Sequence, residues 1–114
     1  MSSESKSTPA DPIELTEQAG LGDVVSTHDV VLVDFHADWC GPCRMVEPTI
    51  EGIASDTDAA VLKIDVDRFQ GLASQHGVQS IPTLLVFAGG EPVERLVGMQ
   101  TDEQLSSLLE EYTG

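Results

Sequence analysis

The densest apolar segment of the chain runs from Val30 to Phe35, where Asp34 is the one polar residue among six. The segment is too short for an isolated helix and is rich in β-branched valine. Because its apolar residues occupy successive positions, it predicts a central strand that is buried on both faces. Cys40 and Cys43 follow where this strand would lead into a helix. In α/β sheets, functional groups collect at that point, beyond the carboxyl ends of the strands.

The rest of the chain alternates between strand-like and helix-like spacing, with turn residues between the segments. Thr16 and Thr101 stand where they would cap the first and the last helix. The predicted elements are an edge strand at 13–16, a helix from there to about 27, a strand at 30–36, a helix at 40–55, a strand at 61–66, a helix at 69–76, a strand at 83–88, a strand at 93–97, and a helix after Thr101 whose apolar stripe is Leu105, Leu108 and Leu109.

This order of elements predicts an α/β fold with a mixed central sheet and helices on both faces. The early strands, which alternate with helices, are expected to be parallel, whereas the last two form an antiparallel hairpin at Gly89-Gly90. With 114 residues and no internal repeat or linker, the chain is expected to make one domain. We assign that domain to residues 12–114 and expect the Ser-rich residues 1–11 to be a disordered tail.

Charge narrows the possible partners. The sequence contains 20 Asp and Glu against 5 Lys and Arg, which gives a net charge of −15. The acids are spread along the whole chain, so nucleic acids and anionic membranes would be poor partners for this surface. The apolar runs are too short to span a bilayer, and no secretory signal is visible, so we expect a cytoplasmic location.

Lysine is nearly absent, with only Lys6 and Lys63. This balance of charge resembles that of proteins from salt-loving microbes, which makes a halophilic source a hypothesis. The alternative is an acidic, highly soluble protein from an ordinary habitat.

The two cysteines are the only ones in the sequence and are separated by two residues. In the cytoplasm such a pair is more often catalytic or metal-binding than structural. A bridge that closes so short a loop would also constrain the unfolded chain very little. The alternative of a zinc site needs two further ligands, for which the sequence offers carboxylates and the histidines His28, His36 and His76.

From Trp39 to Cys43 the chain reads Trp-Cys-Gly-Pro-Cys. A C-x-x-C pair alone is a weak signal, but several further features surround this one. They are the Val33-Asp34-Phe35 segment, Pro48, Lys63, Ile81-Pro82-Thr83 and Gly98. With these features the chain resembles the thioredoxin family over about residues 13–112. The resemblance implies a thioredoxin fold and a thiol–disulfide oxidoreductase that reduces protein disulfides through a reversible Cys40–Cys43 pair.

The resemblance also implies partners. A thioredoxin reductase would return the oxidised pair to the dithiol after each client protein has been reduced, and the chain itself is expected to be a monomer. We expect no cofactor or metal, because the chain is too small for its own flavin site and contains no Gly-rich dinucleotide fingerprint.

Cys40 is the candidate nucleophile, because it would lie at a helix start, where unpaired N–H groups and the helix dipole favour a thiolate. Cys43 lies one turn further along and is expected to be less exposed, with the role of resolving the mixed disulfide. Gly41 would let a partner backbone approach closely. Pro42 suits the first helical turn and stiffens the loop.

Asp34 is predicted to have a raised pKa, because its strand is the most apolar of the chain. It is then a candidate proton acceptor for Cys43 through a water molecule, as the resemblance also implies. The alternative is an Asp at a frayed strand end that faces solvent. Lys63 is expected beside Asp34, where its charge would limit the rise in pKa; the alternative is an exposed strand residue.

The resemblance further implies a cis peptide bond at Ile81-Pro82 that faces the cysteines. The Ile81 backbone would then pair with an extended client strand. An uncharged surface is expected around Cys40, where a partner can dock without repulsion. Its residues are Trp39, Pro42, Ile81, Val97, Gly98 and Met99.

Two residues depart from the family pattern. His36 stands where many thioredoxins have an aromatic residue, and it either packs as a neutral histidine or tunes the acidity of the cysteines. Asp38 adds a negative charge close to Cys40, which would oppose thiolate formation slightly. These departures bear on the redox potential rather than on the reaction.

Two other functions stay open at this point. The domain could be a thioredoxin-like binding module whose cysteines turn over little, or an oxidase or isomerase of the same fold. The Gly-Pro pair between the cysteines favours a reductant, by family resemblance.

The charge pattern predicts a stability that depends on salt. Dense negative charge destabilises the folded state through self-repulsion, and salt screens that repulsion. We therefore expect Tm to rise between dilute buffer and molar KCl. A Tm that does not rise over this range would contradict the halophilic hypothesis.

Overall fold

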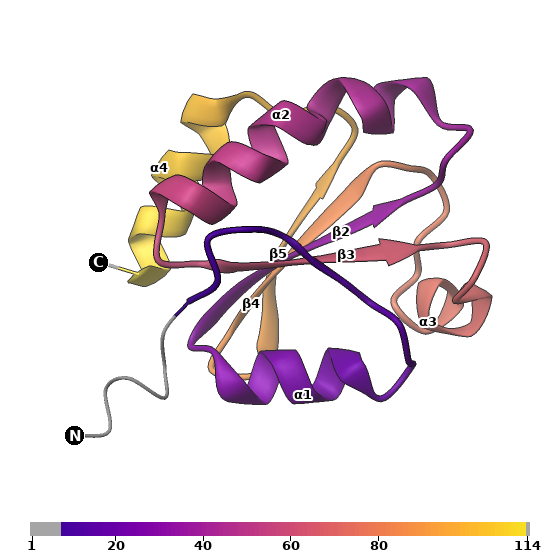
Figure 1. The fold of residues 1–114 in the computed structure, drawn as a ribbon, viewed down its shortest axis with the longest axis horizontal. Helices are drawn as coiled ribbons and strands as arrows, with labels where there is room; N and C mark the ends of the chain where they lie inside the picture. The colour runs from indigo at the N-terminus through magenta and orange to yellow at the C-terminus, as the bar shows by residue number, and fades with distance from the viewer. Residues whose placement is uncertain (1–7, 114) are drawn as a thin grey trace.

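The structure is a computed structural model, and it describes residues 8–113. Helices and strands alternate in the predicted order (Figure 1). Their bounds are β1 Ile13–Glu14, α1 Gly20–Thr27, β2 Val30–His36, α2 Gly41–Asp56, β3 Ala60–Asp65, α3 Gln70–Gln75, β4 Thr83–Ala88, β5 Glu91–Val97 and α4 Asp102–Thr113.

The five strands form one mixed sheet in the order β1-β3-β2-β4-β5. Strand β2 is central and pairs in parallel with β3 and antiparallel with β4, while β4 and β5 form the hairpin. All seven residues of β2 are buried. The mixed sheet, the parallel early strands and the buried central strand predicted from the sequence are therefore confirmed.

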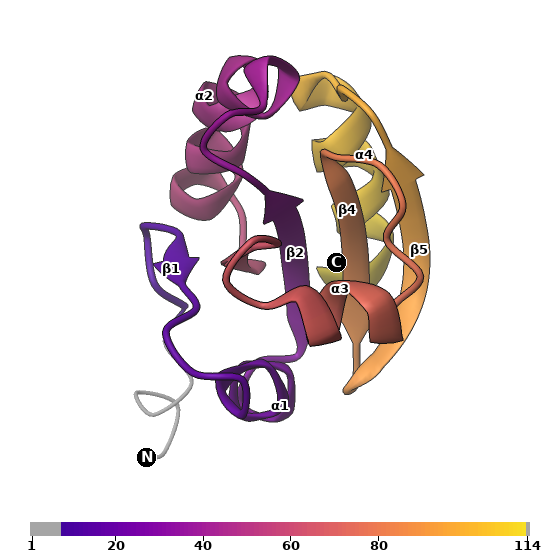
Figure 2. The ribbon, with the colours of Figure 1, turned by 90° about the vertical axis from the view of Figure 1, so that its right-hand side faces the viewer.

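Helices cover both faces of the sheet (Figures 1 and 2). Side chains alternate along β2, so Val31, Val33 and Phe35 pack with residues of α1 and α3, whereas Val30 and Leu32 pack with residues of α2 and α4. The same alternation directs Asp34 toward the side of α2. The fold thus points this carboxyl at the helix that carries the cysteines.

Helix α1 begins later than the sequence predicted. Thr16 does not cap it; residues 17–19 form a turn, and the residue before the helix, Ala19, makes no side-chain capping bond. The chain stays paired with β3 as far as Leu15, whose N–H donates to the Lys63 carbonyl over 2.9 Å, and it turns over residues 17–19 before the helix begins.

The predicted cap of the last helix is confirmed at Thr101. The Gln104 N–H donates to Thr101 Oγ1 over 3.1 Å, and the Thr101 N–H donates to Gln104 Oε1 over 2.9 Å. This reciprocal capping box satisfies two backbone donors at the start of α4.

The N-terminal tail expected at residues 1–11 lies largely outside the described residues. Within the described part, Thr8 Oγ1 donates to the Asp58 carbonyl over 3.2 Å. Disorder of this segment stays a prediction. None of the helices in residues 8–113 is long and apolar enough to cross a membrane.

Candidate active site

Cys40 and Cys43 form a disulfide where β2 leads into α2, with their Cα atoms 5.2 Å apart. Cys40 is the N-cap residue of α2, and the Cys43 N–H donates to Cys40 Sγ over 3.2 Å. This N–H is one of the donors that a helix start leaves without an intrahelical partner. The sulfur of Cys40 therefore lies where the helix favours negative charge.

Both cysteines are buried in the disulfide form. Cys40 is 4% exposed and Cys43 is 3% exposed, so the predicted contrast between them is absent in this oxidised form. The S–S bond itself turns both sulfurs toward each other. Gly41 and Pro42 between them are exposed, and a Cβ built on Gly41 would meet nothing within 4 Å. The loop thus leaves room for the backbone of another molecule.

Trp39 and Ile81 border a shallow hollow of about 370 Å³ beside the disulfide. Trp39 is 67% exposed, and its Nε1 donates to Asp67 Oδ2 over 2.8 Å, which fixes one edge of the ring. The Ile81–Pro82 peptide bond is cis. The carbonyl oxygen of Ile81 lies 3.9 Å from Cys40 Sγ, so this backbone segment faces the disulfide.

The end of β5 completes this surface. Gly98 has φ of 89°, a conformation that favours glycine, and its N–H donates to the Pro82 carbonyl over 2.8 Å. This bond ties the end of the hairpin to the Ile81–Pro82 segment. Val97 and Met99 on either side are 57% and 48% exposed. Large apolar side chains are thus presented to solvent close to the cis peptide bond.

Asp34 is 1% exposed, as its apolar flanks predict. Neither carboxyl oxygen has a hydrogen-bond partner within residues 8–113. Burial raises the pKa of Asp34 from 3.8 to about 6, and the nearby charges of His36 and Lys63 limit the rise. The alternative of a solvent-facing Asp at a frayed strand end is therefore wrong.

Lys63 is the cross-strand neighbour of Asp34 in the β2–β3 pairing. Its ammonium, however, donates to Glu47 Oε2 on α2. Burial alone would lower the pKa of Lys63, but the bond to Glu47 and the negative charges of Glu47 and Asp34 raise it. We did not predict Glu47 from the sequence. Its position four residues after Cys43 was the available signal, because that spacing places both on one helix face.

The two departures from the family pattern make local contacts. His36 is 8% exposed, and its Nε2 lies 3.4 Å from Glu14 Oε2 on the edge strand. The backbone carbonyl of Asp38 accepts two bonds from the Arg44 guanidinium, the shorter over 3.0 Å. This contact brings a positive charge to the start of α2, close to where Asp38 adds a negative one.

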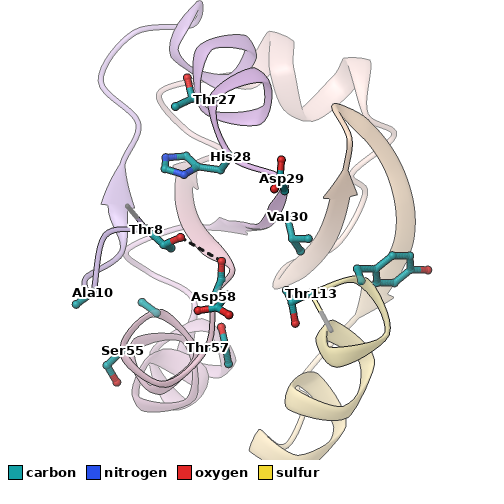
Figure 3. A pocket seen from close by; sticks show the side chains of 12 residues that line it. Thr8, Ala10, Thr27, His28, Asp29, Val30, Ser55, Thr57, Asp58 and Thr113 are labelled. Atoms are coloured by element: carbon teal, nitrogen blue, oxygen red, sulfur yellow. Dashed lines mark hydrogen bonds between the residues drawn. The ribbon is translucent and has the colours of Figure 1, made fainter. Parts of the chain in front are cut away.

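No group of three or more His, Cys, Asp or Glu side chains within residues 8–113 is placed to hold a metal ion. A larger hollow, of about 640 Å³, lies away from the cysteines at the amino end of β2 (Figure 3). It is lined mainly by polar side chains, among them Thr8, His28, Asp29 and Asp58. The disulfide lies beyond the opposite end of β2.

A C-x-x-C disulfide at a helix start on a mixed sheet is the arrangement of a thiol–disulfide oxidoreductase. Comparison with known proteins agrees with this class. The family model described as Thioredoxin matches residues 12–111. The chain therefore belongs to the thioredoxin family, and it is a protein-disulfide reductase.

Individual relatives support the assignment. A thioredoxin of Staphylococcus epidermidis is 49% identical over 85 residues, which cover 73% of this chain and 82% of that protein. A bifunctional thioredoxin reductase/thioredoxin of Mycobacterium leprae is 49% identical over 88 residues, which cover 75% of this chain and 19% of that protein.

Solved structures agree with the fold. A mutant thioredoxin from Halobacterium salinarum NRC-1 superimposes with a TM-score of 0.91 at 54% identity, over 94% of this chain and 95% of that one. An oxidised thioredoxin from Plasmodium falciparum superimposes with a TM-score of 0.80 at 31% identity, over 91% of this chain and all of that one.

Replacing Asp34 by Asn should stabilise the protein at alkaline pH. Because the folded state holds the Asp34 proton up to about pH 6 and the unfolded state loses it near pH 3.8, wild-type stability falls as the pH rises between these values. The difference in pKa corresponds to about 3 kcal/mol. The free energy of unfolding of Asp34→Asn should therefore exceed that of wild type by up to about 3 kcal/mol near pH 8. Below about pH 4 the two free energies should be almost equal.

Urea unfolding at both pH values measures this difference. A gain in stability that is equal at both values would show that the substitution acts through packing and not through ionisation.

Proposed function

We propose that the thiolate of reduced Cys40 attacks one sulfur of a client disulfide. A bond forms between Cys40 and that sulfur, and the second client sulfur leaves as a thiolate. Cys43 then attacks Cys40, which forms the Cys40–Cys43 disulfide and releases the reduced client. The observation that carries the proposal is the Cys43 N–H directed at Cys40 Sγ over 3.2 Å, since the same donor would stabilise a thiolate.

Asp34 is the proton acceptor in the second step. Cys43 must lose a proton before it attacks, and Asp34 lies on the face of the sheet that α2 covers. A base works best when its pKa is close to the working pH, and burial raises the pKa of Asp34 to about 6. A water molecule would carry the proton between the two. Lys63 limits the rise of that pKa through its positive charge.

Clients bind on the uncharged surface around the disulfide. The exposed ring of Trp39 and the side chain of Met99 offer apolar contact, and the open Gly41–Pro42 loop admits a backbone. The Ile81 backbone beside cis Pro82 pairs with an extended client strand, and Gly98 holds that segment in place through its bond to the Pro82 carbonyl.

A thioredoxin reductase supplies the electrons that restore the dithiol. The fused reductase/thioredoxin of Mycobacterium leprae supports this partner, because there the two units belong to one chain. The chain acts as a monomer in the cytoplasm. The net charge of −15 and the similarity to the Halobacterium salinarum thioredoxin support a halophilic setting.

Insulin reduction by dithiothreitol tests these roles. Wild type should accelerate the appearance of turbidity, and Cys40→Ser should show only the uncatalysed rate, because it lacks the attacking thiolate. Cys43→Ser should form the mixed disulfide without resolving it, which mass spectrometry of the trapped complex would detect. Met45→Leu, at an exposed position of α2, is a control that keeps both cysteines.

Equal rates for wild type and Cys40→Ser would instead favour the partner-binding module with little redox turnover. A reduction potential far more oxidising than that of the thioredoxins would favour the oxidase or isomerase.

A further inference from the structure

Glu47 is a charged residue for which the reduction chemistry proposed above has no use. It lies on α2, one turn beyond Cys43, and its carboxylate accepts the bond from the Lys63 ammonium. Its side chain is 39% exposed and that of Lys63 is 15% exposed. The pair therefore bridges from the surface of α2 to the edge of the buried site.

Lys63 is at the same time the cross-strand neighbour of Asp34. A free ammonium at this position would favour the ionised form of a carboxyl that has no hydrogen-bond partner within residues 8–113. Glu47 accepts a hydrogen bond from that ammonium and adds its own negative charge. The two charges have opposite effects on Asp34: Lys63 favours its ionised form, and Glu47 favours its protonated form.

The other charged groups around Asp34 form a second pair of this kind. His36 on β2 and Glu14 on β1 lie 3.4 Å apart, and their effects on Asp34 are also opposite in sign. On the side of β4 the cross-strand neighbour is Leu84, which carries no charge. Cys43 titrates only in the reduced form. The balance at Asp34 is therefore set by two pairs with opposite effects, Lys63 with Glu47 and His36 with Glu14.

We propose that Glu47 is a positioning residue for the reaction: it holds the Lys63 ammonium and offsets its charge, which leaves Asp34 a strong enough base to take the proton of Cys43. This inference rests on the proposed role of Asp34 as proton acceptor. Without Glu47, Lys63 would stabilise the Asp34 carboxylate directly, and a stabilised carboxylate is a weaker base.

A set of variants separates the two charges. In the oxidised protein, where the cysteines do not titrate, carbon NMR of the Asp34 carboxyl reports its ionisation. Glu47→Gln leaves Lys63 unopposed and should move the Asp34 midpoint to lower pH by about half a pH unit. Lys63→Gln leaves the charge of Glu47 unopposed and should move the Asp34 midpoint to higher pH. The double variant removes both charges and should return the midpoint close to that of wild type.

Glu51→Gln is the matched control, because Glu51 is an exposed acid one turn further along α2 and its loss changes the net charge equally. The measurements should be made at the lowest KCl concentration at which the protein stays folded, because salt weakens the interaction within the partly exposed Lys63–Glu47 pair. An Asp34 midpoint that is unchanged in Glu47→Gln, or that moves equally in Glu51→Gln, would overturn the proposal.

The pH profile of insulin reduction distinguishes this failure from a failure of the proposed function. If the pH profile of insulin reduction shifts in each variant in the same direction as the Asp34 midpoint measured by NMR, both proposals are supported. If the midpoint moves in Glu47→Gln and the profile does not, Glu47 does not position Asp34 for the reaction, and Asp34 is not the proton acceptor.

Discussion

The active site depends on how firmly the central strand is held. Strand β2 pairs along its length with β3 and β4, and every one of its residues is buried. Its carboxyl end therefore has a fixed place, and a short turn over residues 37–40 leads from it into α2. Cys40 caps that helix. The same strand carries Asp34 on the face that α2 covers, so β2 holds the carboxyl and sets where the turn that carries Cys40 begins.

Two opposite electrostatic effects meet at this junction. The helix start stabilises negative charge on Cys40, whereas burial opposes negative charge on Asp34. The first effect supports the proposed role of Cys40 as nucleophile, and the second supports the proposed role of Asp34 as base. Around them the exposed apolar side chains of Trp39, Val97 and Met99 interrupt a strongly acidic protein. This apolar area is the surface on which we propose that clients dock.

Much of this arrangement could be predicted from the sequence, because burial leaves a clear pattern. The apolar run at 30–36 identified the central strand, and its single carboxyl identified Asp34. The start of α1 was predicted wrongly, because the chain is paired with β3 up to Leu15 and turns over residues 17–19 before the helix begins. Most contacts between distant side chains were missed, although Lys63 was correctly expected beside Asp34. The Lys63–Glu47 bond and the Trp39–Asp67 bond join separate elements, and periodicity within a segment carries no information on such pairs.

The central claim is that the helix start holds the Cys40 sulfur as a thiolate near neutral pH. The rate of iodoacetamide alkylation of the reduced protein, followed against pH and compared with free cysteine, tests it most directly. The account predicts that alkylation at Cys40, located by peptide mapping, reaches its plateau at a lower pH than free cysteine does. A plateau at the same pH as free cysteine, or a higher one, would contradict it.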